Sequence, residues 1–247
     1  YQKPLMYKLL SHGLLYVLFF LLLKLQYRSD ILVLKHYKGE LVTGFYTLAL
    51  GIGEQLWLLP QALFVVFLSA NSEEVFMRGQ KANKESPKQK DQNNRSIAQQ
   101  SMARFRLSFT IIALAGIIAA VFAQWFIPLI FGKEFMPSIL LFRLLLPGIV
   151  CFSLFKMLSA FFVHSGKPEL LIKAFLPAVI LNISLNILLI PHFGAWIAAA
   201  SSSITYTLSS YLSARYYCQI QNCSLGGLCL LKHSDIQWIM RGIRKNR

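Results

Sequence analysis

Two cationic side chains lie inside an otherwise apolar stretch near the start of the chain, where they could bind an anion. Lys24 and Arg28 are four residues apart and would share one face of a helix. Asp30 would point elsewhere along it, and we include it with them among the candidate substrate-binding residues. Arg suits phosphate because its planar guanidinium donates two parallel hydrogen bonds. The alternative is that the helix has already reached a membrane interface, where Lys and Arg side chains extend toward water. We favour a cavity that attracts a phosphate or an acidic sugar.

Other charged residues in apolar stretches are candidates for the same cavity. Arg143 and Lys156 lie in one later stretch, although both are near enough to its ends to be interfacial. Glu54 lies in the middle of an earlier stretch, between Gly53 and Gln55. A charge within a membrane is costly, so such residues face a partner or a water-filled cavity. We expect Glu54 to pair with a Lys or Arg; the alternative is that it carries a proton in a coupled transport cycle.

Polar and small residues near the end of the sequence are expected to hold helices together. Asn182 and Asn186 are four residues apart and share a helix face, from which Asn side chains form hydrogen bonds across membrane helices. Ala198–Ser203 is a run of small residues that allows close helix approach. We predict a structural role for both features.

Six apolar stretches carry these residues. Hydrophobic residues make up 55% of the 247-residue chain and its mean hydropathy is +0.52, above the usual range of soluble domains. A membrane helix needs roughly 20 mostly apolar residues. We therefore predict an all-α polytopic membrane protein with one six-helix bundle over residues 1–218. The predicted spans are about 9–35, 41–70, 105–131, 137–163, 169–190 and 195–217, with a polar cytoplasmic loop at 71–104 and a basic cytoplasmic tail at 219–247.

The net charge of +15 fits a membrane protein better than a nucleic-acid-binding protein. Cytoplasmic loops collect Lys and Arg, which anionic lipids attract, and no base-reading motif is visible. With the N-terminus inside, the segments that face outside contain only Lys35, Lys38 and Lys133 among the 25 basic residues. Both termini are therefore expected in the cytoplasm. The segment after Ser234 has two interpretations. It is either a short amphipathic helix that lies on the membrane surface or an ordinary basic tail.

No feature of the sequence predicts an enzyme, a cofactor or a metal site. The five His residues are scattered, and no nucleophile–base pair or Gly-rich phosphate loop occurs. Cys218, Cys223 and Cys229 lack the spacing of a zinc site, and together with Cys151 they imply no disulfide framework. Because the chain begins with Tyr1 and shows no cleavage site, we expect a fragment of a longer protein.

Short segments along the chain, in their order and spacing, resemble a known family. They are Arg28-Ser29-Asp30-Ile31-Leu32, Gly44-Phe45-Tyr46-Thr47-Leu48-Ala49, Leu59-Pro60-Gln61-Ala62, Phe131-Gly132-Lys133-Glu134-Phe135, Leu145-Leu146-Pro147-Gly148, Ser165-Gly166-Lys167 and Asn182…Asn186…Ile190-Pro191…Gly194. Together they resemble the second half of bacterial Wzx-type O-antigen flippases, of the multidrug/oligosaccharidyl-lipid/polysaccharide exporter superfamily. The chain departs from that pattern at Ala195-Trp196-Ile197-Ala198-Ala199, where the family usually shows a glycine-alanine-alanine step.

The resemblance implies one bundle of a twelve-helix transporter, whose partner would be a missing N-terminal bundle. It implies translocation of undecaprenyl-diphosphate-linked oligosaccharide across the bacterial inner membrane for surface polysaccharide biosynthesis, by alternating access. One alternative is a cation-coupled drug exporter of the same superfamily, which is expected to show more acidic residues within its spans, for cationic substrates. Another is a membrane-embedded polysaccharide polymerase or ligase, which would need a large periplasmic loop.

Overall fold

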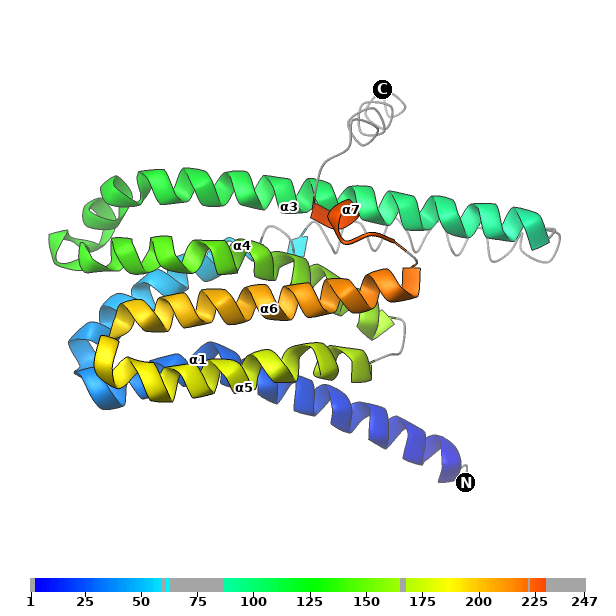
Figure 1. The fold of residues 1–247 in the computed structure, drawn as a ribbon, viewed down its shortest axis with the longest axis horizontal. Helices are drawn as coiled ribbons and strands as arrows, with labels where there is room; N and C mark the ends of the chain where they lie inside the picture. Colours follow the sequence, from blue (N-terminus) through cyan, green and yellow to red (C-terminus); the bar gives the residue numbers. More distant parts are fainter. Residues whose placement is uncertain (1–2, 59–60, 63–86, 165–167, 222, 230–247) are drawn as a thin grey trace.

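The computed structural model describes residues 3–58, 61–62, 87–164, 168–221 and 223–229, and these residues form helices without any strand. The elements are α1 (Lys3–Gln55), α3 (Pro87–Phe131), the short 3₁₀ helix η2 (Lys133–Phe135), α4 (Pro137–His164), α5 (Pro168–Phe193), α6 (Ala195–Gln221) and α7 (Gly226–Cys229). Figure 1 shows the long helices running roughly parallel or antiparallel to one another. The predicted all-α class is confirmed.

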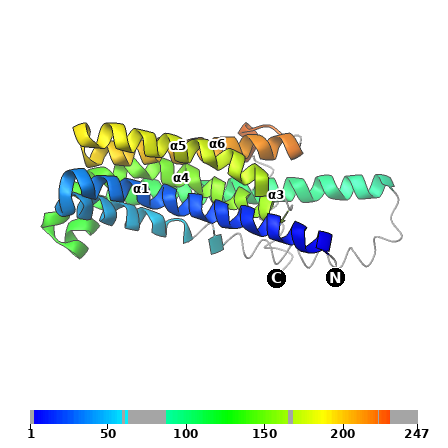
Figure 2. The same ribbon diagram turned by 90° about the horizontal axis from the view of Figure 1, so that it is seen from below.

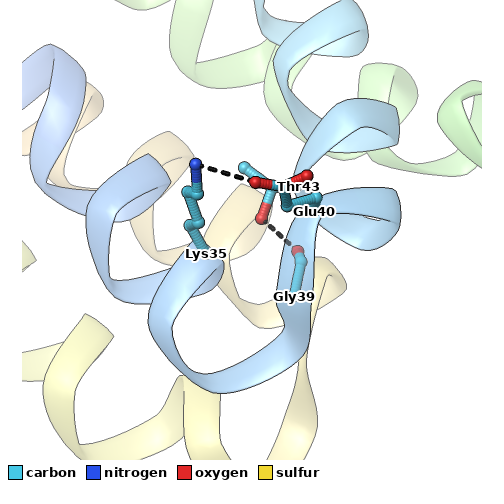
Figure 3. A network of polar contacts seen from close by, with 4 residues as sticks. All are labelled: Lys35, Gly39, Glu40 and Thr43. Carbon is cyan, nitrogen blue, oxygen red and sulfur yellow. Dashed lines mark hydrogen bonds and ion pairs between the residues drawn. The ribbon is translucent and has the colours of Figure 1, made fainter.

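Helix α1 is a hairpin of two helical arms. Gly39 separates residues 3–38 from 40–55. Its φ of 79° and ψ of −178° are a backbone conformation that residues other than glycine rarely adopt. In Figure 1 the chain reverses here and the second arm returns along the bundle. The hydroxyl of Thr43 donates to the Gly39 carbonyl over 2.7 Å, and Lys35 Nζ lies 3.0 Å from Glu40 Oε1 across the turn (Figure 3). The hairpin provides two antiparallel helices where the sequence predicted two spans.

Three tight turns lie at one end of the bundle. Gly39, Gly132 and Gly194 all have positive φ, of 79°, 99° and 76°. Figure 1 shows these turns together at its left, and the rings of Phe45 and Phe135, 5.7 Å apart, join two of them. At the opposite end, α3 projects past α4 and α6 (Figures 1 and 2).

Three helices of the described part of the chain are long and apolar enough to cross a membrane. They cover Phe105–Phe131, Pro137–Val163 and Pro168–Phe193, close to three of the six predicted spans. The predicted spans 9–35 and 195–217 are helical throughout. The predicted span 41–70 is helical from its start to Gln55, and its residues 63–70 lie outside the described residues. Helix α6 differs from the three apolar helices in its many Ser and Thr residues, several of which are fully buried.

The boundary of α3 differs from the prediction. The helix begins at Pro87, so residues 87–104 of the predicted loop 71–104 are helical. Proline is well suited to the first position of a helix, and the Lys, Gln, Ala, Met and Arg residues that follow have high helix propensity. Helix α6 continues to Gln221, and α7 lies within the predicted tail. Residues 71–86 and the helix predicted after Ser234 lie outside the described residues.

Close packing of α4 against α6 forms the centre of the bundle. The Gly148 amide donates to Ser203 Oγ over 2.7 Å, and a Cβ at Gly148 would collide with the Ser203 backbone. The rings of Phe152 and Phe155 stack at 4.7 Å, and Phe155 stacks on Phe175 of α5 at 4.9 Å. Helix α5 packs against α6 and α1, and α3 packs against the outside of α4. This core fixes the position of α4 relative to both arms of α1.

Candidate functional site

A cleft of about 460 Å³ lies mainly between the first arm of α1 and α4. Lys24 enters it from α1 and Lys156 from α4, so residues distant in sequence contribute positive charge to one place. Phe20 and Lys24 are exposed, which opens the cleft to the outside of the described bundle. Apolar side chains form much of its wall, among them Phe19, Phe20, Leu23, Phe155 and Val163. The cleft therefore combines cations with an apolar surface.

Aromatic rings hold the Lys156 ammonium group. Lys156 Nζ lies 4.3 Å from the centre of the Trp57 ring and 5.6 Å from that of Tyr27. Trp57 is itself fixed, because its Nε1 donates to the Ile149 carbonyl of α4 over 2.9 Å. A cation over an aromatic face is attracted by the ring quadrupole. Lys156 thus keeps its ammonium group near the cleft without a carboxylate within ion-pair distance among the described residues.

Glu54 lies on the second arm of α1, within the electrostatic field of these cations. Arg28, Lys156 and Lys24 all lie near enough to attract its carboxylate. None of them forms an ion pair with it, since the one ion pair among the described residues joins Lys35 and Glu40. Glu54 Oε1 is buried and has no hydrogen-bond partner in the described part of the protein. The structure therefore shows no ion pair of Glu54 with a Lys or Arg among the described residues.

Asp30 occupies a different environment, in the interior of the bundle. Its side chain is fully buried. It accepts hydrogen bonds from the Tyr46 hydroxyl of the second arm, from Ser202 Oγ of α6 over 3.1 Å and from the Ile31 amide over 2.8 Å. The structure therefore does not bring Asp30 into the cleft with Lys24 and Lys156, although the sequence grouped the three residues.

The Asp30 environment continues as a polar network between α1, α5 and α6. Asn182 accepts from Ser29 Oγ over 3.1 Å and donates to Thr205 Oγ1 over 3.1 Å. Asn186 donates to Asn182 over 3.0 Å and accepts from Ser201 Oγ over 2.7 Å. Both Asn residues therefore take part in hydrogen bonds that join helices of the bundle. Sequence reasoning missed the hydroxyl groups of α6, because it treated their run of small residues as packing alone.

Arg143 lies apart from the cleft as well. Its Nε donates to the Ala120 carbonyl over 3.0 Å, and one terminal nitrogen lies 3.5 Å from Gln124 Oε1. Both partners belong to α3, on the outer side of α4. Of the five predicted substrate-binding residues, the structure thus places Lys24 and Lys156 in the wall of the cleft, and Arg28 acts with them on Glu54.

The aromatic partners of Lys156 were not found from the sequence. Tyr27 is three residues after Lys24 and so lies near the same helix face. This spacing is the one feature of the sequence that could have placed an aromatic ring near the cleft. Trp57 comes close to Tyr27, with ring centres 5.5 Å apart, through the reversal at Gly39.

Comparison with family models, with curated proteins and with solved structures found no match to this chain, so its function is inferred from the cleft and the helices.

Proposed function

We propose that the chain is one bundle of a flippase that moves undecaprenyl-diphosphate-linked oligosaccharide across the bacterial inner membrane. The observation that carries this proposal is the cleft, in which Lys24 and Lys156 lie beside exposed apolar side chains. Such a surface suits an amphipathic anion, which has a charged head and an apolar chain. The sequence resemblance to Wzx-type flippases adds the polyprenyl diphosphate as the specific ligand.

The outer surface of α3 supports placement in a membrane. Its exposed apolar side chains include Ile111, Leu114, Ile117, Ile118, Val121, Phe122, Trp125 and Leu129. A soluble monomer rarely exposes a continuous apolar surface of this kind. In the proposed orientation, the end with the three glycine turns faces the periplasm and carries Lys35, Lys38 and Lys133. The opposite end, where the described residues include Lys3, Lys8, Lys88, Lys90, Arg95 and Arg215, faces the cytoplasm.

The charges around the cleft suit a diphosphate diester. Lys24, Arg28 and Lys156 supply three positive charges in the field of one acidic residue, Glu54. A diphosphate diester carries two negative charges, which such a group attracts. Lys156 is already removed from bulk water by Trp57 and Tyr27, so its interaction with an anion is stronger than that of an exposed lysine. The polyprenyl chain would lie against Phe19, Phe20 and the surrounding lipid.

Transport requires that the cleft open alternately to the two sides of the membrane. In the proposed mechanism a second six-helix bundle packs beside this one, and rocking of the two bundles transfers the headgroup from the inner to the outer leaflet. In this mechanism the helices of the bundle would move as a unit, held together by the hydrogen bonds between α1, α5 and α6.

A cation-coupled drug exporter of the same superfamily is a second candidate, favoured by one observation. Asp30 is an acidic residue that is fully buried, with hydroxyl groups and a backbone amide as its partners. An exporter of this kind would need acidic residues for a cationic substrate or a coupling ion. Efflux of a cationic dye that depends on Asp30 and not on Lys24 or Lys156 would favour it.

Charge reversal in the cleft tests the flippase proposal. The complete gene, carrying Lys24→Glu, Arg28→Glu or Lys156→Glu, is introduced into a flippase-deficient strain, and surface polysaccharide is measured together with the amount of protein in the membrane. We expect each variant to reach the membrane and to lose surface polysaccharide. Lys133→Glu, at an exposed turn, is the matched control and should restore it. Normal polysaccharide from the cleft variants would count against the proposal.

A further inference from the structure

Two cysteine thiols meet at the end of α6. The Cys223 thiol donates to Cys218 Sγ, and the two sulfur atoms lie 2.9 Å apart. Cys218 is buried and Cys223 is partly exposed. This contact is not expected from spacing, because side chains five residues apart in a continuous α-helix point about 140° away from each other.

The end of the helix brings the two thiols together. Helix α6 ends at Gln221, and the Cys223 amide donates to the Cys218 carbonyl over 3.1 Å. A bond from an amide to the carbonyl five residues earlier is typical of a helix end at which the chain turns back on itself. The backbone therefore holds the two sulfur atoms in contact before any covalent bond forms between them.

The segment after Cys223 is anchored to α3. Arg106 of α3 donates to the Gly227 carbonyl of α7 over 2.6 Å, and Leu228 is fully buried. Beside Cys218, the buried ring of Tyr217 lies 5.7 Å from Phe105 of α3. The two thiols thus lie where α6 meets the segment that packs against α3.

We propose that Cys218 and Cys223 form a reversible thiol–disulfide site that fastens the end of α6 to the segment carrying α7. A disulfide has its sulfur atoms about 2.05 Å apart, so the two sulfurs would approach by less than about 1 Å. The site is distinct from the cleft, and the inference does not depend on the proposed transport function.

The reaction is a two-electron exchange with a low-molecular-weight disulfide such as oxidised glutathione. The Cys223 thiolate, which is the more accessible, attacks one sulfur of that disulfide and releases one thiol. The Cys218 thiolate then attacks Cys223 Sγ and releases the second thiol. Two protein thiols become one disulfide, and the two protons and two electrons that they lose are carried by the two thiols released. Excess reduced glutathione reverses both steps.

Redox titration of the purified chain in detergent tests the inference. The protein is equilibrated in glutathione buffers of increasing oxidised fraction, the remaining thiols are alkylated, and tryptic peptides are analysed by mass spectrometry. Cleavage after Arg215 and Lys232 leaves Cys218, Cys223 and Cys229 in one peptide and Cys151 in another. We expect the first peptide to lose two of its three alkylation sites on oxidation and to regain them on reduction.

Single substitutions identify the partners. Cys229→Ser and Cys151→Ser should form the same disulfide as the unmodified chain, whereas Cys223→Ser should leave Cys218 open to alkylation under all conditions. The inference is overturned if Cys218 and Cys223 stay alkylated in oxidised glutathione alone, or if Cys229→Ser abolishes the disulfide. It is also overturned if a glutathione mixed disulfide accumulates on Cys223. If Cys223→Ser does not fold, oxidation of the unmodified chain and of Cys229→Ser still shows whether Cys218 and Cys223 form the disulfide.

Discussion

Lys156 Nζ lies 4.3 Å from the centre of the Trp57 ring, although Lys156 belongs to α4 and Trp57 to the turn that follows α1, far away in sequence. The reversal of α1 at Gly39 brings Trp57 back along the bundle, and its hydrogen bond to the Ile149 carbonyl fixes the ring against α4. The ammonium group is therefore held beside the cleft by an aromatic surface, and its charge is available to a ligand.

Replacing Lys156 should weaken ligand binding while leaving the stability of the protein almost unchanged. Lys156→Met keeps an unbranched side chain and removes the charge. A cation over an aromatic ring contributes about 0.5–2 kcal/mol, and relief of the desolvated ammonium offsets part of that loss. We expect the free energy of unfolding in detergent to change by no more than about 1 kcal/mol, while binding of a polyprenyl diphosphate weakens. A much larger loss of stability would show that Lys156 is a structural residue.

The buried carboxylate of Asp30 should be needed for stability. Asp30→Ala leaves the hydroxyls of Tyr46 and Ser202 without their acceptor, and a buried polar group that loses its partner costs about 1–3 kcal/mol. Thermal unfolding monitored by circular dichroism should show a clear decrease in Tm. Ser184→Ala, at an exposed position of α5, is the control and should leave Tm unchanged. Equal Tm values for Asp30→Ala and the control would contradict this role of the network.

The contact between α4 and α6 should not tolerate a methyl group at Gly148. A Cβ there would collide with the backbone of Ser203, which cannot move away as a side chain can. We expect Gly148→Ala to destabilise the bundle by about 1–3 kcal/mol, as overpacking of a core does. Gly44→Ala is the matched control, because nothing lies within 4 Å of its Cβ, and it should gain about 0.5–1 kcal/mol. The same denaturation measurement on both variants checks the difference.

The hairpin turn should depend on its glycine and very little on its ion pair. Gly39→Ala places a side chain in a backbone conformation reserved for glycine, at a cost of about 1–3 kcal/mol. Lys35→Ala removes a contact whose side chains are 60% and 84% exposed, and such pairs contribute about 0–1 kcal/mol. Urea unfolding of the two variants should therefore rank Gly39→Ala as the less stable. The reverse order would mean that the ion pair defines the turn.

The sequence allowed the helices to be predicted well but the contacts between them poorly. Apolar stretches of membrane length, ended by Gly or Pro, place the starts of α4, α5 and α6 within a residue or two of their observed positions. The start of α3 was missed because an exposed helix and a loop are both polar, so hydropathy cannot distinguish them. The partners of Asp30 could not be predicted, since they depend on the rotation of α6 and on the register of the two arms of α1.

The cationic residues show the same difference between what can and cannot be predicted from the sequence. Lys24 and Lys156 were found because charge in an apolar stretch is conspicuous, and the cleft does unite them. Arg143 is equally conspicuous, but its contacts with Ala120 and Gln124 depend on α3 packing outside α4. The contact between Cys218 and Cys223 arises from a helix end that periodicity alone does not locate.

Binding of a headgroup to the cleft can be measured directly. The protein is placed in lipid nanodiscs, and its affinities for a fluorescent undecaprenyl diphosphate-linked sugar and for uncharged undecaprenol are compared. We expect at least a tenfold preference for the diphosphate, about 1.4 kcal/mol. The double variant Lys24→Gln/Lys156→Gln should lose this preference, and Lys133→Gln should keep it. Equal preference in the folded double variant and in the unmodified protein would contradict the claim that this cleft binds the anionic headgroup.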